Sequence, residues 1–281
     1  MPATPSLTCY ILDTGHCLAH EHHLIQGGER RAVDCHSIVA LLQHPEHGWL
    51  LWDAGYAPRM LAATARFPYR LYRWITPLRL RPELAAVAQL PRYGITPADI
   101  GAVIVSHFHA DHECGLLDFP TSRYVTLPEA YASIANLRGL AALRRGHLPA
   151  LLPADFAARV TLLDRFTGPP LPELGPTHDY FGDGSLLLVR LPGHARGQMG
   201  MLANTTRGRL FFVADSCWLA RSVQTRRPPA RITHFIADDP AQVQRTIDGL
   251  HAFAEARSDV LIVPSHCPET FRREVETAPA A

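Results

Sequence analysis

The sequence predicts an α/β fold in which two similar layers of structure face each other. Strand-like and helix-like segments alternate along the 281-residue chain, and each half leads from sheet to helix to a strand that ends in histidine. With 47% hydrophobic and 19% charged residues, the composition is that of a globular protein. A chain of this length can bury roughly 75% of its unfolded surface. We therefore expect one domain over residues 1–281.

Strands in the first half are expected where short apolar runs are bounded by turn residues, at 7–12, 37–42, 49–53, 102–106 and 123–127. The turn chemistry of residues 44–48 predicts early antiparallel pairing. Residues 58–90 are helical in pattern but interrupted by prolines, and they mix aromatic residues with arginines. We expect this segment to be a lid-like insertion.

The second half repeats this organisation. A helix is expected over 129–145, and the proline-punctuated region 146–175 should form short helical turns, so that 129–175 is a second insertion. Asp239 and Pro240 predict the start of another helix. Strands are expected over 185–191, 200–204, 210–214 and 260–263.

Composition excludes several classes of function. Basic and acidic side chains nearly balance at a net charge of +1, so neither nucleic acid nor an anionic membrane is an expected partner. All 27 basic residues are arginines, which excludes chemistry that needs a lysine amine. The six scattered cysteines form no CxxC pair and are expected to be reduced, and no signal peptide or membrane span is apparent. We expect a cytoplasmic protein, and the sequence leaves its oligomeric state open.

A dense group of metal-ligand side chains follows the strand at 102–106. The run His107-Phe108-His109-Ala110-Asp111-His112 holds three imidazoles and a carboxylate within six residues. Alternate side chains of an extended backbone lie on one side, so His107 and His109 can share one ion. Past the bend, Asp111 and His112 can serve a neighbouring ion.

Three more candidate ligands stand at the ends of predicted strands, namely His194, Asp215 and His266. Imidazole and carboxylate ligands suit Zn²⁺ first, with Mn²⁺, Fe²⁺ or Co²⁺ as alternatives. Seven ligands for two ions leave open coordination positions. A carboxylate between the ions would leave room for a bridging water of lowered pKa, so the predicted reaction class is hydrolysis.

This pattern, HxHxDH followed by distant His, Asp and His, resembles the signature of the metallo-β-lactamase superfamily, and the resemblance extends from Thr8 to about Glu269. It implies an αββα sandwich of four layers with the metals at one edge. It also implies site roles: the first ion on His107, His109 and His194, the second on Asp111, His112 and His266, and a bridge at Asp215. The run Leu51-Trp52-Asp53-Ala54-Gly55 is similar to a family motif in which Asp53 would support a ligand histidine.

Within the superfamily, the stretches 90–112 and 204–218 look most like the acyl homoserine lactone lactonases. Such lactonases usually place a tyrosine three residues after the bridging aspartate, where this chain has Trp218. The resemblance implies a dinuclear hydrolase of a small ester-like, lactone or thioester substrate, with a metal-bridging hydroxide held by Asp215 and proton relay through Asp111. A small-molecule phosphodiesterase and a metal-binding sensor with weak turnover are the alternatives.

Aromatic residues of the first insertion are the candidates for a substrate pocket. If residues 58–90 cover the site, Tyr69, Tyr72 and Trp74 could line an apolar tunnel together with Trp218, and neighbouring arginines could meet a carboxylate or phosphate. Ordinary amphipathic packing of this segment is the competing interpretation.

Overall fold

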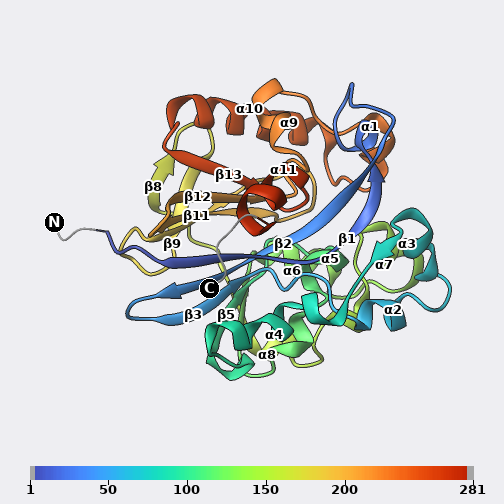
Figure 1. Ribbon diagram of the computed structural model, residues 1–281, viewed down its shortest axis with the longest axis horizontal. Coiled ribbons are helices and arrows are strands. Elements are labelled where there is room, and N and C mark those ends of the chain that lie inside the picture. The colour runs from blue at the N-terminus through green and yellow to red at the C-terminus, as the bar shows by residue number, and fades with distance from the viewer. Residues whose placement is uncertain (1–3, 277–281) are drawn as a thin grey trace.

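Two β-sheets stacked face to face, with helices on both outer sides, make up the structure, a computed structural model that describes residues 4–276 (Figure 1). The first sheet has the strand order β4-β1-β2-β3-β5-β6-β7. Its strands are β1 (Thr8–His20), β2 (Ala32–His44), β3 (Gly48–Trp52), β4 (Leu78–Arg79), β5 (Ile100–Ile104), β6 (Arg123–Thr126) and β7 (Val160–Leu162). The α/β prediction and its αββα arrangement are confirmed.

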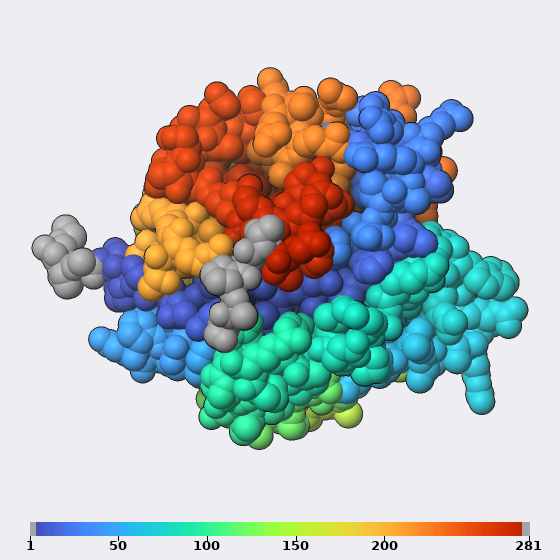
Figure 2. Space-filling view, viewed as in Figure 1, coloured from blue at the N-terminus to red at the C-terminus, as the bar shows by residue number. Residues whose placement is uncertain are grey.

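The second sheet has the order β13-β12-β11-β10-β9-β8. Its strands are β8 (Gly168–Leu171), β9 (Gly175–Asp179), β10 (Leu186–Arg190), β11 (Met199–Thr205), β12 (Gly208–Ala214) and β13 (Val260–Pro264). The space-filling view shows the C-terminal part of the chain, orange to red, on one side of the molecule and segments coloured cyan to green on the other (Figure 2). The blue N-terminal strands run between them.

Most helices are short. The α-helices are α1 (Glu21–Leu24), α2 (Arg59–Ala63), α3 (Arg70–Ile75), α4 (Ala86–Gln89), α5 (Ala110–Glu113), α6 (Pro128–Ile134), α7 (Gly139–Arg144), α8 (Phe156–Arg159), α9 (Ala220–Thr225), α10 (Pro240–Ala256) and α11 (Pro268–Phe271). Short 3₁₀ turns occupy Pro82–Leu84, Leu90–Tyr93, Pro97–Asp99, Leu116–Asp118, Pro149–Leu151 and Arg231–Phe235, and Arg272–Glu276 is a π-helical turn. Among residues 4–276, no helix is both long enough and apolar enough to cross a bilayer.

The long helix α10 forms where the sequence predicts it. The Asp239 side chain accepts a hydrogen bond from the backbone N–H of Gln242 at 3.0 Å, which caps the helix, and Pro240 occupies its first turn. Val243, Ile247 and Leu250 are buried along one face, in a cluster with residues of β10, β11 and β12. This helix therefore covers the outer face of the second sheet.

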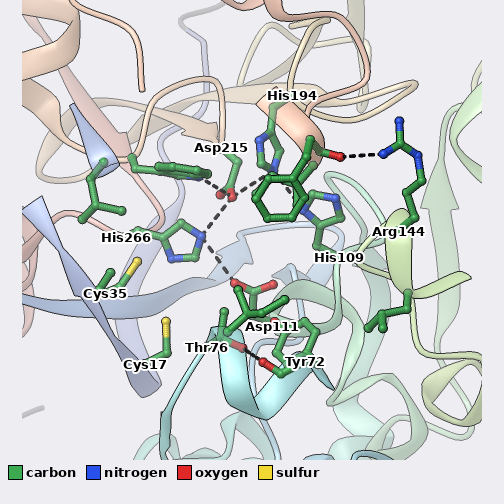
Figure 3. A pocket seen from close by; sticks show the side chains of 18 of the residues that line it. Cys17, Cys35, Tyr72, Thr76, His109, Asp111, Arg144, His194, Asp215 and His266 are labelled. Atoms are coloured by element: carbon green, nitrogen blue, oxygen red, sulfur yellow. Dashed lines mark hydrogen bonds and ion pairs between the residues drawn. The ribbon is translucent and has the colours of Figure 1, made fainter. Parts of the chain in front are cut away.

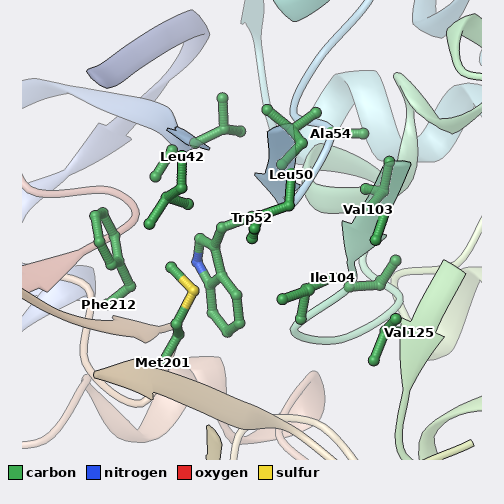
Figure 4. Packing of buried hydrophobic residues seen from close by; sticks show 14 of the residues in the cluster. Leu42, Leu50, Trp52, Ala54, Val103, Ile104, Val125, Met201 and Phe212 are labelled. Carbon is green, nitrogen blue, oxygen red and sulfur yellow. The ribbon is translucent and has the colours of Figure 1, made fainter. Parts of the chain in front are cut away.

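The main core lies between the two sheets (Figure 4). Trp52 of β3 is fully buried there, together with Ile104 of β5 and with Met201 and Phe212 of the second sheet. Burying large apolar side chains of this kind contributes roughly 1.5–3 kcal/mol each. The two halves are thus held together by one continuous apolar layer.

Two sequence expectations about the second insertion are wrong. The helix expected over 129–145 is divided into α6 and α7, because Arg138 is extended, with φ −144° and ψ 161°, and Gly139 after it has a φ of +59°. Region 146–175 contains the strands β7 and β8 besides helical turns. Pro169 and Pro170 indicated turns, but β8 is the edge strand of its sheet, where proline is tolerated.

Both sheets present strand ends at one edge of the sandwich. β3 pairs with β5 in parallel, and so does β12 with β13, so the carboxyl ends of each pair point the same way. The sheets are linked there by a hydrogen bond from Met199 N to the carbonyl oxygen of Ser106, at 3.2 Å. Residues that follow these strands therefore meet at a common edge.

Candidate metal centre

The histidine-rich run lies at this edge. His107 follows β5, and His109 precedes the short helix α5, whose first turn holds Asp111 and His112. His107, His109 and His112 are buried, and Asp111 is partly exposed. The change from strand to helix gathers these side chains in one small region instead of spreading them along a strand.

One group of ligand atoms belongs to His107, His109, His194 and Asp215, which all lie within 4.8 Å of one another. His194 Nε2 is 2.9 Å from His109 Nδ1 and 3.2 Å from Asp215 Oδ2. A second group, equally tight, belongs to Asp111, His112 and His266. His266 Nε2 is 3.4 Å from Asp111 Oδ2.

Asp215 joins the two groups (Figure 3). Its Oδ2 lies 3.0 Å from His266 Nε2, and its Oδ1 lies 3.2 Å from His112 Nε2. The preceding residue, Ala214, has a φ of +48°, a conformation that costs energy for a residue with a Cβ and that redirects the chain at the strand end. The structure thus brings together all seven residues that the sequence predicted as ligands, with Asp215 in the middle.

Asp53 contacts a ligand of this centre without being a ligand itself. Its carboxylate accepts hydrogen bonds from Ser106 N at 2.7 Å and from Ser106 Oγ at 2.8 Å, and it lies 2.8 Å from His112 Nδ1. When His112 donates from Nδ1, its Nε2 is left free as a ligand. Asp53 itself has a φ of +55°, so backbone strain is stored at this position too.

Burial and charge set the protonation of the metal-free centre. Burial holds the pKa of His107 and of His109 well below the usual histidine value, so both rings are neutral at neutral pH. Burial alone would also lower the pKa of His266, but the carboxylates of Asp215 and Asp111 together outweigh it and raise that pKa to about 9. Burial would raise the pKa of Asp215, but His266, His112 and His194 together hold it well below its usual range.

The donor set fits divalent ions. His107 Nε2 is a buried polar atom without a hydrogen-bond partner among the described residues, and buried His112 Nε2 and Asp215 Oδ1 have only the ion pair that they form with each other at 3.2 Å. Such atoms are costly to bury, and a metal ion would satisfy each of them. Imidazole nitrogens with carboxylate oxygens are the ligands that zinc and related transition metals prefer.

A cavity of about 450 Å³ opens over this centre (Figure 3). Its floor holds His109, Asp111, His194, Asp215 and His266. Most of its wall is apolar, and the members of that wall come from distant segments: Leu24, Ile75, Leu140, Leu143, Phe235 and Ile236. Both expected insertions contribute to the wall, and Arg144 is the one arginine among the described lining residues.

Two of the four aromatic pocket candidates line this cavity. Trp218 is in the wall, and its indole Nε1–H donates a hydrogen bond to Asp215 Oδ2 at 3.0 Å. Tyr72 is the second. Tyr69 and Trp74 are not lining residues: the Tyr69 hydroxyl accepts a hydrogen bond from Gly139 N at 2.8 Å, and Trp74 is 67% exposed beside the Arg70 guanidinium. Tyr72 and Trp74 lie two residues apart in the helix α3, and residues at this spacing point to nearly opposite sides of a helix.

Sequence reasoning missed other lining residues. Tyr56 comes three residues after Asp53 and is almost fully buried in the cavity wall, so its place after a strand end could have indicated it. Cys17 and Cys35 line the cavity because β1 and β2 extend well beyond their predicted ends. No local signal pointed to those two.

Comparison with known proteins agrees with the architecture and the ligand pattern. A family model described as "Metallo-beta-lactamase superfamily" matches residues 32–199, which include the HxHxDH run and His194. The chain belongs to the metallo-beta-lactamase superfamily. This confirms the resemblance seen in the sequence and assigns the chain as a metal-dependent hydrolase.

Several curated proteins are similar in sequence to this chain. The N-acyl homoserine lactonase AttM of Azorhizobium caulinodans is 27% identical over 199 residues, covering 68% of this chain and 67% of the relative. A probable metallo-hydrolase of Mycobacterium tuberculosis is 26% identical over 92% of this chain and 83% of its own length. The lactonase AiiB of Agrobacterium fabrum is 23% identical and covers 93% of this chain and 94% of the relative.

Solved structures share the fold. An N-acyl homoserine lactone hydrolase, with the product N-hexanoyl-L-homoserine bound at its catalytic metal centre, superposes with a TM-score of 0.72 at 16% identity, covering 96% of this chain and 97% of that one. The dizinc quorum-quenching lactonase AidC gives a TM-score of 0.63 at 15% identity, with coverage of 95% and 91%. At these identities the likeness concerns the fold alone.

Proposed function

We propose that this member of the superfamily is a dinuclear hydrolase of small ester-like, lactone or thioester substrates. The observation that carries the proposal is the position of Asp215, which contacts both groups of ligand atoms at the floor of an apolar cavity. An apolar wall suits an acyl chain, and a floor of metal ligands suits the carbonyl group to be cleaved. The printed activity of the lactonase relatives agrees with such a substrate.

The ligand set supports two divalent ions, with zinc the best fit and iron or manganese as alternatives. His107, His109 and His194 would hold one ion, Asp111, His112 and His266 the other, and Asp215 would touch both. When bound, two such ions would supply hydroxide near neutral pH and would polarise the bond to be broken. A dizinc relative of the same fold supports this number.

The protein's own groups would orient the substrate and move a proton. Asp111 lies on the cavity floor and is the more exposed of the two carboxylates, so it is placed to pass a proton to the leaving group. Burial raises the pKa of Tyr56 and of Tyr72 well above the usual tyrosine value, so both phenols stay protonated. A protonated phenol in the cavity wall can donate a hydrogen bond to a carbonyl oxygen.

Phosphodiester hydrolysis is disfavoured by the same wall. Among the described lining residues outside the metal centre, Arg144 is the one cationic side chain, and it also donates to the carbonyl oxygen of Phe235 at 3.3 Å. Phosphate recognition usually uses several charged donors. A sensor of the same fold would bind metal without turnover, and measuring both metal content and hydrolysis distinguishes a sensor from an enzyme.

The partner we propose is accordingly a small molecule. The described cysteines are unpaired, which agrees with the reducing cytoplasm as its compartment.

The test combines metal analysis with a substrate panel. Purified protein loaded with zinc should hold about two equivalents per chain and should hydrolyse lactones, thioesters or aryl esters in preference to phosphodiesters. Asp215→Ala should lose metal and turnover, whereas Asp164→Ala, an exposed aspartate outside the centre, should lose neither. Two bound metals without hydrolysis of any panel member would favour a sensor, and a preference for phosphodiesters would overturn the substrate assignment.

A further inference from the structure

Two cysteines face each other in the wall of the cavity. Cys17 of β1 and Cys35 of β2 are directly opposite partners in the antiparallel pair, and both line the cavity (Figure 3). They belong to a small apolar cluster with Leu24, Leu219 and Trp218. Neither the proposed hydrolysis nor the metal centre uses them.

Their spacing suits a disulfide bond. Directly opposite residues of an antiparallel pair have Cα atoms about 4.5–5.5 Å apart, inside the range of about 4.4–6.8 Å that disulfides span. Opposite Cβ atoms lie about 4.5–5.5 Å apart, whereas a disulfide holds them at about 3.5–4.5 Å. The two side chains therefore need to approach each other by roughly 1 Å for the bond to form.

These two cysteines are also the accessible ones. Cys17 and Cys35 are 8% and 7% exposed, whereas Cys9, Cys114, Cys217 and Cys267 are between 0% and 3% exposed. None of those four lines the cavity. A small reagent that enters the cavity can therefore reach one opposed pair of thiols and no other cysteine.

We propose that Cys17 and Cys35 form a redox-active dithiol site in the cavity wall, which a small hydroperoxide oxidises to a disulfide. The first thiolate attacks the peroxide oxygen, the O–O bond breaks, and a sulfenic acid forms as water or an alcohol leaves. The second thiol displaces water from that sulfur, and the S–S bond forms. Two S–H bonds are lost and one peroxide is reduced, and a dithiol reductant reverses the change.

Oxidation at this place would reshape the cavity near the metal centre. The wall is shared with Trp218, whose indole holds Asp215, so a movement of the cysteines reaches the neighbours of the metal centre. The same dithiol should chelate a trivalent arsenical, because one arsenic atom binds two adjacent thiols with loss of water.

The test follows the thiols, independently of turnover. The native, reduced protein is treated with hydrogen peroxide, denatured, and titrated for free thiols. We expect the count to fall from six to four, and to return to six after dithiothreitol. Peptide mapping of the unmodified chain should show one new link, between the peptides that hold Cys17 and Cys35. Phenylarsine oxide should bind once per chain and prevent that link.

Matched variants separate this site from general oxidation. Cys17→Ser and Cys35→Ser should each abolish the link and the arsenical binding. Cys9→Ala should keep both, because Cys9 lies in the same strand opposite Leu42. Six remaining thiols after peroxide, a link between other cysteines, or sulfinic acid formation without a link would each overturn the proposal. All of these readouts stand whether or not the chain hydrolyses esters.

Discussion

The indole N–H of Trp218 donates its hydrogen bond to Asp215 Oδ2, at 3.0 Å. The same oxygen lies 3.0 Å from His266 Nε2 and 3.2 Å from His194 Nε2, so Trp218 fixes the carboxylate that joins the two groups of ligands. Because indole has a single donor, this hydrogen bond leaves none for a substrate. Trp218 is thus a positioning residue, and the wall must polarise a carbonyl with other groups.

Substitutions of Trp218 should change the turnover of lactones and of aryl esters, which have better leaving groups, to different extents. Trp218→Tyr supplies a phenol in the wall, so we expect lactone turnover to rise relative to aryl ester turnover. Trp218→Phe removes the hydrogen bond without adding a donor, and both rates should fall by roughly tenfold, about the worth of one hydrogen bond to a charged group. Steady-state kinetics of both variants on both substrates measure this. An unchanged ratio of lactone to aryl ester turnover in Trp218→Tyr, or unchanged rates in Trp218→Phe, would contradict this role of Trp218.

The metal centre was predictable because its ligands stand at the ends of strands. Apolar runs such as 102–106 end abruptly in His107, and chain polarity then determines that these ends meet. The pocket was less predictable, since its members come from segments whose orientation depends on tertiary packing. Tyr72 and Trp74 lie two residues apart on α3, and one lines the cavity while the other is in solvent.

Cys17 and Cys35 show a second kind of limit. The apolar run at 7–12 ends before Asp13 and Gly15, so the local pattern stops β1 there. In the structure the register shifts between Asp13 and His16, and pairing with β2 then continues to His20. A register shift of this kind is stabilised by hydrogen bonds to the neighbouring strand, so the sequence of one strand alone does not predict it.

Replacing Asp53 should weaken the centre from outside the ligand set. In Asp53→Ala, Ser106 N loses its acceptor and His112 Nδ1 loses its partner, both in the buried interior. We expect about 2 kcal/mol less stability in the metal-free protein, by denaturant titration, since buried groups are left unpaired. Zinc affinity should fall roughly 10–100-fold. Unchanged affinity would mean that Asp53 does not orient His112.

Zinc binding should release protons at neutral pH. The pKa of His266 is raised to about 9 in the metal-free protein, so this ring is protonated at pH 7 and must lose its proton to become a ligand. A raised pKa means that protons compete with zinc below pH 9, and affinity should increase as the pH rises towards that value. Calorimetry at pH 7 in two buffers of different ionisation enthalpy gives the proton count. A count of zero would contradict the protonated His266.

Burial raises the pKa of the Tyr72 phenol, so this group stays protonated and can donate a hydrogen bond. We expect that hydrogen bond to affect turnover more than binding of the acyl chain. Tyr72→Phe keeps the ring in the wall but removes the donor, so we expect kcat to fall and KM to change little if the phenol binds the carbonyl oxygen in the transition state. Tyr69→Phe is the matched control, since Tyr69 lies in the same segment outside the cavity. Equal effects of the two substitutions would remove Tyr72 from the proposed mechanism.

The last prediction concerns Gly146, which lies against a ligand. A Cβ added at Gly146 would meet His109 Cδ2 at 2.5 Å, a distance that real Cβ contacts do not reach, and the residue has a φ of +65°. Gly146→Ala therefore combines backbone strain with a steric clash against the His109 ring.

Gly139→Ala is the control that distinguishes backbone strain from the steric clash, because Gly139 has a φ of +59° and no atom within 4 Å of the added Cβ. Both variants should lose about 1 kcal/mol of stability from the left-handed backbone. Only Gly146→Ala should also bind zinc less tightly at the site of His107, His109 and His194, which metal titration and elemental analysis measure. If both variants bind zinc as the unmodified protein does, the contact between Gly146 and His109 does not set the geometry of the centre.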